Sequence, residues 1–569
     1  METSTEVTNR KNSRTNRRWF ILLIGVILLI VLAVLGRMAV YHVGATPFSH
    51  VPLESGNIEV PTARTLEWQD RSETTDRLLE HWAKHSLGEW KTDGKVGAPR
   101  ALMGRFLLKR DLEAANAYLL SVTPWGKAGS TWERHPEGDY DFTLAGLTPI
   151  LFLFGDQPDV LYPKTREHLL KVLLPLEGGE PLVMVPRTLG LVRDTENHLL
   201  MTEGSRYLKN RWLALHGSQR PVHDNVANSL EAWLLNLLEE LRTAGLYEFN
   251  SIPYEGYTLT AVLNLEAFGS EAVQQAARDL LDQLNWNYAL GSLGFRRFPP
   301  FRRQPKHADD TGLTGDRHAA LIKSWVSLLP SAPGNIEVTE SHHVGLWACW
   351  SPYRLPDKVA QWILEKPNEY YVQIGHGSRS SPEIYSGGPG YLLTAGGVYR
   401  RTRSLLVARP ITLILDDDDA TDLSQVLHLS GPGDDYRQWN NTGVWRDFAV
   451  TGGPVSIPQN WFPDAKGKTW KVYRRGKDQC VAVHSSTHLG VVHLTRSSNP
   501  QAVLEAVEKA NSDNDALRHS FHQPGGSRID YDTGASCNRW VIERIDGMPV
   551  DRRFDAWPRL QGEGVNETK

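Results

Sequence analysis

NVANSLEAWLLNLLEEL, residues 225–241, shows most clearly how the first half of this chain folds. Its large apolar residues recur at steps of three and four: Val226, Leu230, Trp233, Leu234, Leu237, Leu238 and Leu241. Because an α-helix has about 3.6 residues per turn, this spacing places them on one face. The stretch therefore predicts a long helix with one buried face.

The same spacing continues on both sides, from about Leu66 to Pro330. The further predicted helices are Asp76–Trp90, Arg105–Leu120, Thr143–Phe154, Lys164–Leu174, Glu196–Trp212, Thr258–Phe268, Glu271–Leu290 and Asp316–Leu329. Helices joined by short links pack as antiparallel pairs, and a run of such pairs closes into a toroid or extends as a solenoid. No fixed repeat period is visible, so an α/α toroid over residues 66–330 is predicted.

After about Asn335 the pattern changes to short runs of β-branched and aromatic residues between turn residues. The predicted strands are Tyr370–Ile374, Tyr391–Thr394, Leu405–Ala408, Ile411–Leu415, Val481–His484, Gly490–Leu494 and Trp540–Glu543. Many short strands at close spacing are typical of an antiparallel β-sandwich. We predict one over residues 335–560, interrupted by a helix at Gln501–Ala510.

The N-terminal part carries a membrane signal. Residues 19–36 hold no charge over 18 residues, close to the length that crosses a bilayer as a helix. A basic tail at 1–18 precedes this span and a linker at 37–65 follows it. The tail contains Arg10, Lys11, Arg14, Arg17 and Arg18, and basic flanks stay cytoplasmic. The sequence predicts a single-pass protein with a periplasmic or extracellular bulk, and a cleaved signal peptide ending near Val43-Gly44-Ala45 is the alternative.

Composition excludes several classes of protein. The chain has 40 % hydrophobic residues and 19 tryptophans, which rules out a disordered protein. The net charge is −4, and without the basic tail of residues 1–18 it is −7, so nucleic acid is not an expected partner. Three cysteines form no disulfide framework, and a single bridge between Cys480 and Cys537 stays open.

The first candidate site residues are Asn197 and His198, near the start of the predicted helix 196–212. Either Asp194 or Thr195 is placed to cap that helix. An amide beside an imidazole can hold a carboxylate while the imidazole takes a proton. The alternative is a turn-capping asparagine beside a structural histidine.

Two tyrosines follow in the loop that leads to the helix 258–268, at Tyr254 and Tyr257. A phenol has a pKa near 10, about three units above neutrality, so it serves as acid or base only where its surroundings perturb it. The alternative is that both rings pack and leave their hydroxyls in water.

An aromatic and basic cluster comes next, in residues 295–306 (FRRFPPFRRQPK). Its candidate binding residues are Arg296, Arg297, Arg302 and Arg303, with Arg317 close behind. Guanidinium groups bind carboxylates or sulfates through two hydrogen bonds. The alternative is a basic loop that docks on acidic groups of its own chain.

Helices followed by strands, with Asn197-His198, a later tyrosine and an arginine-rich loop, resemble the polysaccharide lyases of the alginate, hyaluronate and heparinase-like group. The resemblance covers the helical and the β-rich part of the chain. The sequence departs from the Asn-Asn-His triplet, because Glu196 stands where an asparagine is found. The resemblance implies an acidic polysaccharide as substrate and cleavage by β-elimination.

The resemblance also implies roles for single residues. Asn197 would neutralise the uronate carboxylate and His198 would remove the C5 proton. Tyr254 or Tyr257 would act as the acid or as a combined acid and base. Arg296 or Arg297 would assist in binding the carboxylate.

Two other functions remain open. Asp194, Glu196 and Glu203 keep a glycoside hydrolase possible, because Glu196 and Glu203 lie two helical turns apart, about 10 Å. The third function is a membrane-tethered protein that binds polysaccharide without cleaving it.

No metal and no cofactor are predicted. Asp416–Asp419 directly follow a strand and lack the spacing of a calcium loop, so a polar turn is expected. The histidines of the β-rich part match no zinc motif and are expected to be structural. They are His342, His343, His376, His484, His488 and His493.

Overall fold

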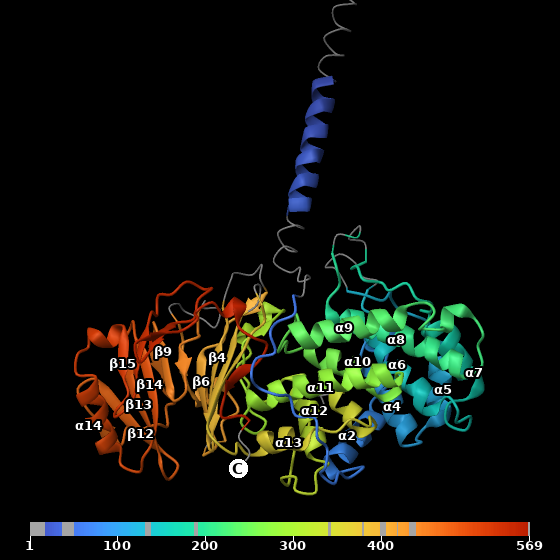
Figure 1. Ribbon diagram of the computed structural model, residues 1–569. Coiled ribbons are helices and arrows are strands. Elements are labelled where there is room, and N and C mark those ends of the chain that lie inside the picture. The colour runs from blue at the N-terminus through green and yellow to red at the C-terminus, as the bar shows by residue number, and fades with distance from the viewer. Residues whose placement is uncertain are drawn as a thin grey trace, which may run out of the picture.

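The computed structural model describes residues 17–36, 51–130, 138–186, 190, 192–339, 343–377, 381–398, 405–417, 419–431 and 440–566. Along the chain it has an N-terminal apolar helix, a helical region and an antiparallel β-sheet region, and the last two lie side by side (Figure 1). Arg10, Lys11, Arg14, the Val43–Ala45 cleavage site, His342 and Asp418 lie outside the described residues.

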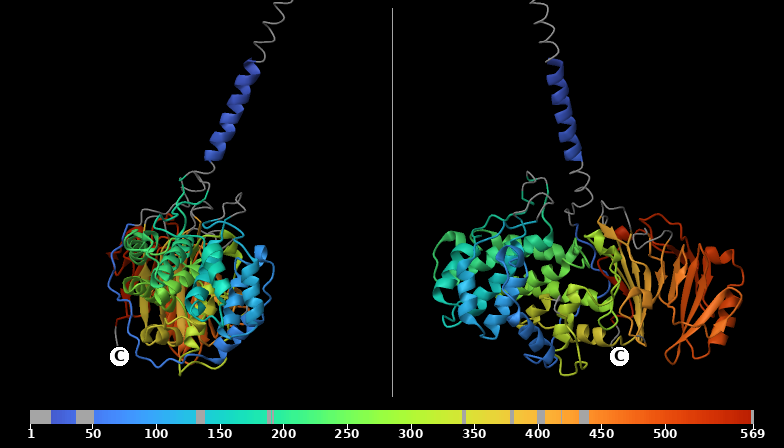
Figure 2. Two further views of the ribbon diagram at one scale, coloured as in Figure 1. Left: turned by 90° about the vertical axis from the view of Figure 1, so that its right-hand side faces the viewer. Right: turned by 180° about the vertical axis from the view of Figure 1, so that it is seen from behind.

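The N-terminal helix Arg17–Gly36 is long and apolar enough to cross a membrane, and none of it is buried. It stands apart from both regions in all three views (Figures 1 and 2). A signal sequence has the same length and composition, so retention of this helix and the orientation of the chain stay predictions.

The helical region confirms the helical spacing of residues 66–330. Its helices are α2 (Glu73–Lys84), α3 (Trp90–Asp93), α4 (Gly97–Leu107), α5 (Leu112–Ser121), α6 (Asp141–Phe154), α7 (Pro163–His168), α8 (Glu196–Leu215), α9 (Leu230–Ala244), α10 (Glu255–Phe268), α11 (Glu271–Leu290), α12 (Arg317–Val326) and α13 (Asp357–Leu364). A π-helical turn, Leu169–Leu173, extends α7. Helices α6, α8 and α10 pack against one another and bring the site residues together.

Two predicted helices differ from the structure because the backbone turns left-handed. Lys109 and Asp111 have φ values of 51° and 47°, so Arg105–Leu120 is not one helix but the end of α4 and most of α5. Ser229 has a φ of 66°, so the helix predicted from Asn225 begins at Leu230. Side chains other than glycine rarely adopt this conformation, and spacing alone does not reveal it.

The β-sheet region contains three main antiparallel sheets. The seven-stranded sheet has the order β10 (Val455–Ser456), β7 (Leu427–Leu429), β6 (Ile411–Leu415), β4 (Tyr391–Gly396), β3 (Glu383–Gly388), β2 (Tyr370–Ile374), β19 (Gln561–Glu563). The six-stranded sheet has the order β11 (Ala465–Lys466), β12 (Trp470–Arg475), β13 (Gln479–Ser485), β14 (Gly490–Arg496), β9 (Phe448–Thr451), β8 (Val444–Trp445). One hydrophobic core contains side chains from both sheets.

The four-stranded sheet completes this region with β15 (Ser520–His522), β16 (Arg528–Tyr531), β17 (Ile542–Ile545) and β18 (Met548–Pro549). The predicted helix near 501–510 is confirmed as α14 (Pro500–Ala510). The strand predicted at Trp540–Glu543 lies two residues later, as β17. The first predicted strand, Tyr370–Ile374, is confirmed as β2, and a 3₁₀ helix (His343–Cys349) and α13 lie between Asn335 and that strand.

A short pairing joins the two regions. Strand β1 (Phe301–Arg302), inside the aromatic and basic cluster, pairs with β5 (Leu406–Val407) of the β-sheet region. Phe301 and Arg302 are both buried. The pairing therefore draws Phe301 and Arg302 of that cluster into the junction between the regions, away from solvent.

Candidate functional site

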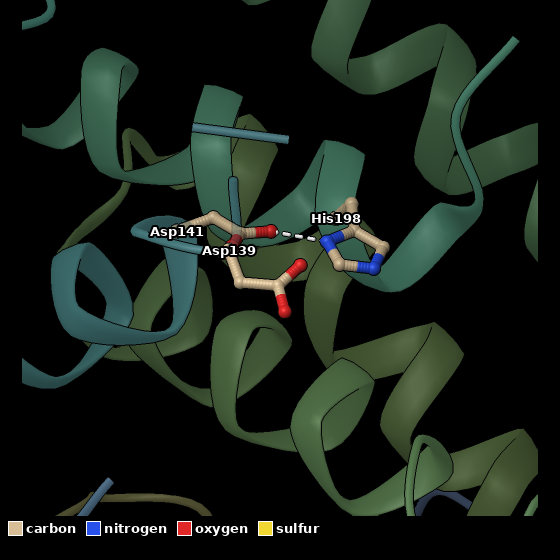
Figure 3. Close-up of side chains that lie close together, drawn as sticks. All are labelled: Asp139, Asp141 and His198. Atoms are coloured by element: carbon tan, nitrogen blue, oxygen red, sulfur yellow. Dashed lines mark hydrogen bonds and ion pairs between the residues drawn. The ribbon is translucent and has the colours of Figure 1, made fainter. Parts of the chain in front are cut away.

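The N-terminal ends of α6 and α8 place a histidine and an aspartate against each other. His198 lies in the first turn of α8, Asp141 begins α6, and both side chains are buried. His198 Nδ1 lies 2.5 Å from a carboxylate oxygen of Asp141 (Figure 3). A carboxylate on Nδ1 orients the ring and leaves Nε2 as its other polar end.

Asp139 and Lys95 extend this pair toward solvent. One donor atom each from Asp139, Asp141 and His198 lie within 4.8 Å of one another, and the carboxylate of Asp139 sits beside the pair in Figure 3. The ammonium of Lys95 lies 2.5 Å from Asp139, and its side chain is 38 % exposed. The cluster thus runs from a buried imidazole to a partly exposed rim.

Carboxylates control the charge of His198. Burial alone would lower the pKa of this imidazole, but Asp141 and Asp194 outweigh burial and raise the pKa to about 9. Burial raises the pKa of Asp141 to about 6 even though the imidazolium lowers it. At neutral pH the pair is therefore an imidazolium and a carboxylate.

Asn197 offers an amide hydrogen next to this pair. Its Oδ1 accepts hydrogen bonds from the backbone N–H of His198 at 2.7 Å and from the hydroxyl of Thr195 at 2.6 Å. Its Nδ2 is buried and has no hydrogen-bond partner among the described residues. The backbone of Thr195 occupies the cap position of α8, as one of the two predicted capping residues.

Tyr257 is connected to His198 through an aromatic contact. The ring of Phe142 meets the rings of His198 and Tyr257 edge-on, with centroids at 5.6 and 4.5 Å. The guanidinium of Arg317 lies 4.5 Å from the centre of the Tyr257 ring. Tyr257 is not in a loop, as predicted, but in the first turn of α10.

A glycine allows this approach of α10 and α12. A Cβ atom added to Gly256 would lie 2.6 Å from Cβ of Arg317, closer than real contacts allow. Since Arg317 begins α12, the missing side chain lets Arg317 reach over Tyr257.

Tyr254 and Arg303 form a second part of the rim. Gln304 donates a hydrogen bond to the Tyr254 hydroxyl at 2.6 Å. The guanidinium of Arg303 lies 5.5 Å from the ring centre of Tyr254 and 2.8 Å from Glu248. Burial raises the pKa of Tyr254, opposed by the charges of Arg303 and Lys95. Lys95 thus links the tyrosine to the aspartates.

The other predicted arginines lie elsewhere. Arg296 donates to the carbonyl of Leu415 at 2.6 Å, at the end of β6. Arg297 is buried in ion pairs with Asp316, at 3.0 Å, and Glu255, at 3.6 Å. Arg296 and Arg297 thus bind groups of their own chain, as expected if the cluster is a basic loop that docks on the protein itself.

Arg302 is also buried, with its guanidinium 3.7 Å from the ring centre of Tyr247. Arg303 and Arg317 are therefore the two predicted arginines that contact the predicted catalytic tyrosines.

Glu196 belongs to a separate carboxylate pair. Its Oε1 accepts the backbone N–H of Glu248 at 2.7 Å. Burial and the charge of Glu248 raise the pKa of Glu196, and burial raises the pKa of Glu248. Glu203 is instead held by Arg206, at 2.9 Å, and by the N–H of Leu182.

Of the remaining sequence candidates, His343 belongs to the site, because its Nε2 lies 3.4 Å from the hydroxyl of Tyr257. Asp416 and Asp417 form the polar turn expected after β6. All three cysteines are free, so no bridge joins Cys480 and Cys537. In the β-sheet region His376 is paired with Glu383 at 2.6 Å.

Four site residues escaped the sequence analysis: Lys95, Asp139, Asp141 and Glu248. Asp141 starts an apolar helix, where an aspartate is normally explained by the helix dipole. Its contact with His198 spans 57 residues of sequence. No local signal marks the other three.

Comparisons with known proteins leave the chain without an assigned family. No family model matches it, and neither a curated protein nor a solved structure does.

Proposed function

We propose that this protein is a membrane-anchored lyase that cleaves an acidic, uronate-containing polysaccharide by β-elimination. The observation that carries the proposal is the buried Asp141–His198 pair together with the amide nitrogen of the adjacent Asn197, which has no hydrogen-bond partner among the described residues. A positive charge and an amide donor on neighbouring residues would suit the carboxylate of a uronate. We also propose that the helical region is an α/α toroid and the β-sheet region a sandwich.

Elimination requires the carboxylate to be neutralised before the C5 proton leaves. The imidazolium of His198 and the amide of Asn197 supply this neutralisation in our proposal, because the raised pKa keeps His198 protonated at neutral pH. A protonated imidazole cannot accept a proton. In our proposal His198 therefore neutralises the carboxylate and does not remove the C5 proton, which is the role that the resemblance implied.

The tyrosines then handle the protons. Tyr257 lies under the guanidinium of Arg317, and its hydroxyl is 3.4 Å from Nε2 of His343. The phenolate of Tyr257 removes the C5 proton, the C5–H electron pair forms the C4=C5 double bond, and the C4–O bond breaks. The leaving oxygen takes a proton from a tyrosine, Tyr257 itself or Tyr254. Arg303 and Lys95 at the rim would bind neighbouring acidic sugars.

Product analysis tests the reaction. The full-length chain in detergent, supplied with uronate polymers, is expected to produce unsaturated ends that absorb ultraviolet light. Tyr257→Phe and Asn197→Ala should each remove this absorbance. Substrate that binds to the protein but is never cleaved would instead establish the non-catalytic function.

The dependence of rate on pH tests the role of His198. If the imidazolium neutralises the carboxylate, kcat/KM falls as the pH rises through about 9. A rate that rises through the same range would return His198 to the role of base.

A hydrolase is the second candidate, favoured by the raised pKa of Glu196 beside Glu248. A protonated and an ionised carboxyl are the pair that glycoside hydrolysis requires. Products would then be heavier by one water and lack the ultraviolet absorbance, and Glu248→Gln would abolish them.

We further propose that the helix Arg17–Gly36 stays as an anchor with the N-terminus in the cytoplasm. Its length and apolar composition support this orientation together with the basic residues before it. Protease added outside intact cells should then remove both large regions and leave the tail protected.

A further inference from the structure

We propose that Asp139, Asp141 and His198 form a binding site for a divalent transition-metal ion, with Zn²⁺ as the best-fitting ion. This proposal does not depend on the lyase activity. It rests on the geometry of the three side chains and on one buried carboxylate oxygen.

The spacing of the donor atoms suits a metal. The three atoms lie within 4.8 Å of one another, and His198 Nδ1 is 2.5 Å from Asp141. In a tetrahedral zinc site with ligand bonds near 2.0–2.2 Å, neighbouring ligand atoms are about 3.3 Å apart. Figure 3 shows the three side chains gathered at one place, before any movement that a bound ion would require.

Asp141 supplies an independent indication of a ligand. One of its oxygens contacts His198, while the other, Oδ1, is buried without a hydrogen-bond partner among the described residues. The side chain is fully buried. A buried carboxylate oxygen without a donor is unfavourable, and a metal ion would satisfy it.

The charge of the surroundings also favours a cation. Asp194 is a third carboxylate whose charge acts on both Asp141 and His198. Lys95 opposes the metal, since its ammonium lies 2.5 Å from Asp139. Its side chain is 38 % exposed, so it can turn into solvent when a metal takes its place.

The ligand set selects the class of metal. One imidazole nitrogen and two carboxylate oxygens suit zinc and its first-row neighbours, whereas Ca²⁺ and Mg²⁺ prefer oxygen ligands alone. Metal binding requires the neutral imidazole, so the metal-bound state and the imidazolium of the proposed function are alternative states of His198. Three protein ligands would leave one position of a tetrahedral ion open.

Calorimetry tests the proposal. The full-length chain in detergent is treated with a chelator, dialysed, and titrated with ZnCl₂. One saturable site per chain is expected, and CaCl₂ or MgCl₂ should give no such heat. His198→Gln and Asp139→Asn should each weaken zinc binding by at least tenfold.

Two further variants make the test specific. Lys95→Gln removes the competing ammonium and should tighten zinc binding severalfold, which no purely structural ion pair predicts. Asp156→Asn is the matched control: Asp156 pairs with His216 at 2.9 Å, but both side chains are exposed. It should leave zinc binding unchanged.

The contrary results are equally clear. Absence of saturable heat, or zinc binding that His198→Gln and Asp139→Asn leave unchanged, would overturn the proposal. If His198→Gln or Asp139→Asn fails to fold, the Lys95→Gln variant still decides: weaker zinc binding by that variant would overturn the proposal. Since heat is measured without substrate, a missing lyase activity does not affect the result.

Discussion

Two buried histidine–carboxylate pairs, one in each region, look alike and have opposite charge preferences. His198 lies 2.5 Å from Asp141 in the helical region, and His376 lies 2.6 Å from Glu383 in the β-sheet region. All four side chains are at most 5 % exposed. Yet the pKa of His198 is raised, while burial lowers the pKa of His376.

The neighbours of each pair explain this difference. Additional carboxylates, Asp139 and Asp194, raise the pKa of His198. His376 has two guanidinium groups nearby, from Arg302 and Arg559, and stacks on Phe249 with ring centres 3.9 Å apart.

The comparison teaches that contact distance does not define a reactive pair. Glu383 is also fully used, since it accepts hydrogen bonds from Tyr385 and Asn250 as well. Asp141 keeps one oxygen without a partner among the described residues. Only the helical pair has both a cation and an unused acceptor, which suits it to a ligand.

The largest expected effect is on activity. Asp141→Asn should lower the kcat of polysaccharide cleavage by about 10²–10⁴-fold, because it removes the carboxylate that keeps His198 charged and oriented. Glu383→Gln should leave kcat within about twofold, since that pair lies outside the proposed site. Initial rates at saturating substrate measure both, and equal losses would remove the functional distinction between the pairs.

The second effect is on stability, and here the buried pair of the β-sheet region is compared with an exposed pair. Glu383→Gln should lower the free energy of unfolding by about 1–3 kcal/mol, because it removes the carboxylate acceptor that His376, Tyr385 and Asn250 share in the interior. Guanidinium unfolding in detergent measures the change. The exposed Asp156→Asn should cost at most about 1 kcal/mol. If Glu383→Gln and Asp156→Asn lowered the free energy of unfolding by similar amounts, burial would not explain the contribution of the Glu383 pair.

The smallest effect is the pH dependence of stability. A raised pKa means that His198 stabilises the fold fully below its ordinary value of about 6.5 and loses this contribution as the pH rises through about 9. The stability difference between wild type and His198→Gln should therefore shrink by about 3 kcal/mol over that range.

Hydrogen–deuterium exchange at the imidazole C2 position, read by mass spectrometry, gives the two pKa values directly. His198 should titrate near 9 and His376 below its ordinary value. If both histidines titrated near the ordinary pKa of about 6.5, the proposed difference between the two pairs would be wrong.

Local signals made much of the helical fold predictable. Helix α11, Glu271–Leu290, has the predicted bounds because Ser270 caps its start through the N–H of Val273 and Gly291 follows its end. The predictions were wrong where Lys109 or Ser229 adopts a left-handed backbone, and also for Asp76–Trp90, because α2 ends at Lys84 and residues 85–89 are not helical. A left-handed backbone depends on how the neighbouring helices meet, and spacing does not report it.

The candidate site was only partly predictable. Asn197, His198, Tyr254 and Tyr257 stand out by residue type, and α8 and α10 position all four. The arginine-rich cluster looks uniform in the sequence, but its members go to different places. Arg297 forms buried ion pairs, whereas Arg303 lies over Tyr254. Which arginine meets which carboxylate is decided by packing between distant segments.

The sequence by itself determined the order of elements: an apolar N-terminal helix, helices with one buried face, and then antiparallel strands. Periodicity and turn residues act over a few neighbours, and they carry that information locally. Only the tertiary structure decided that Asp139 and Asp141 gather at His198, that Lys95 pairs with Asp139, and that the amide nitrogen of Asn197 has no partner among the described residues. The charge of a buried imidazole depends on every carboxylate and guanidinium near it, and folding brings those together from far along the chain.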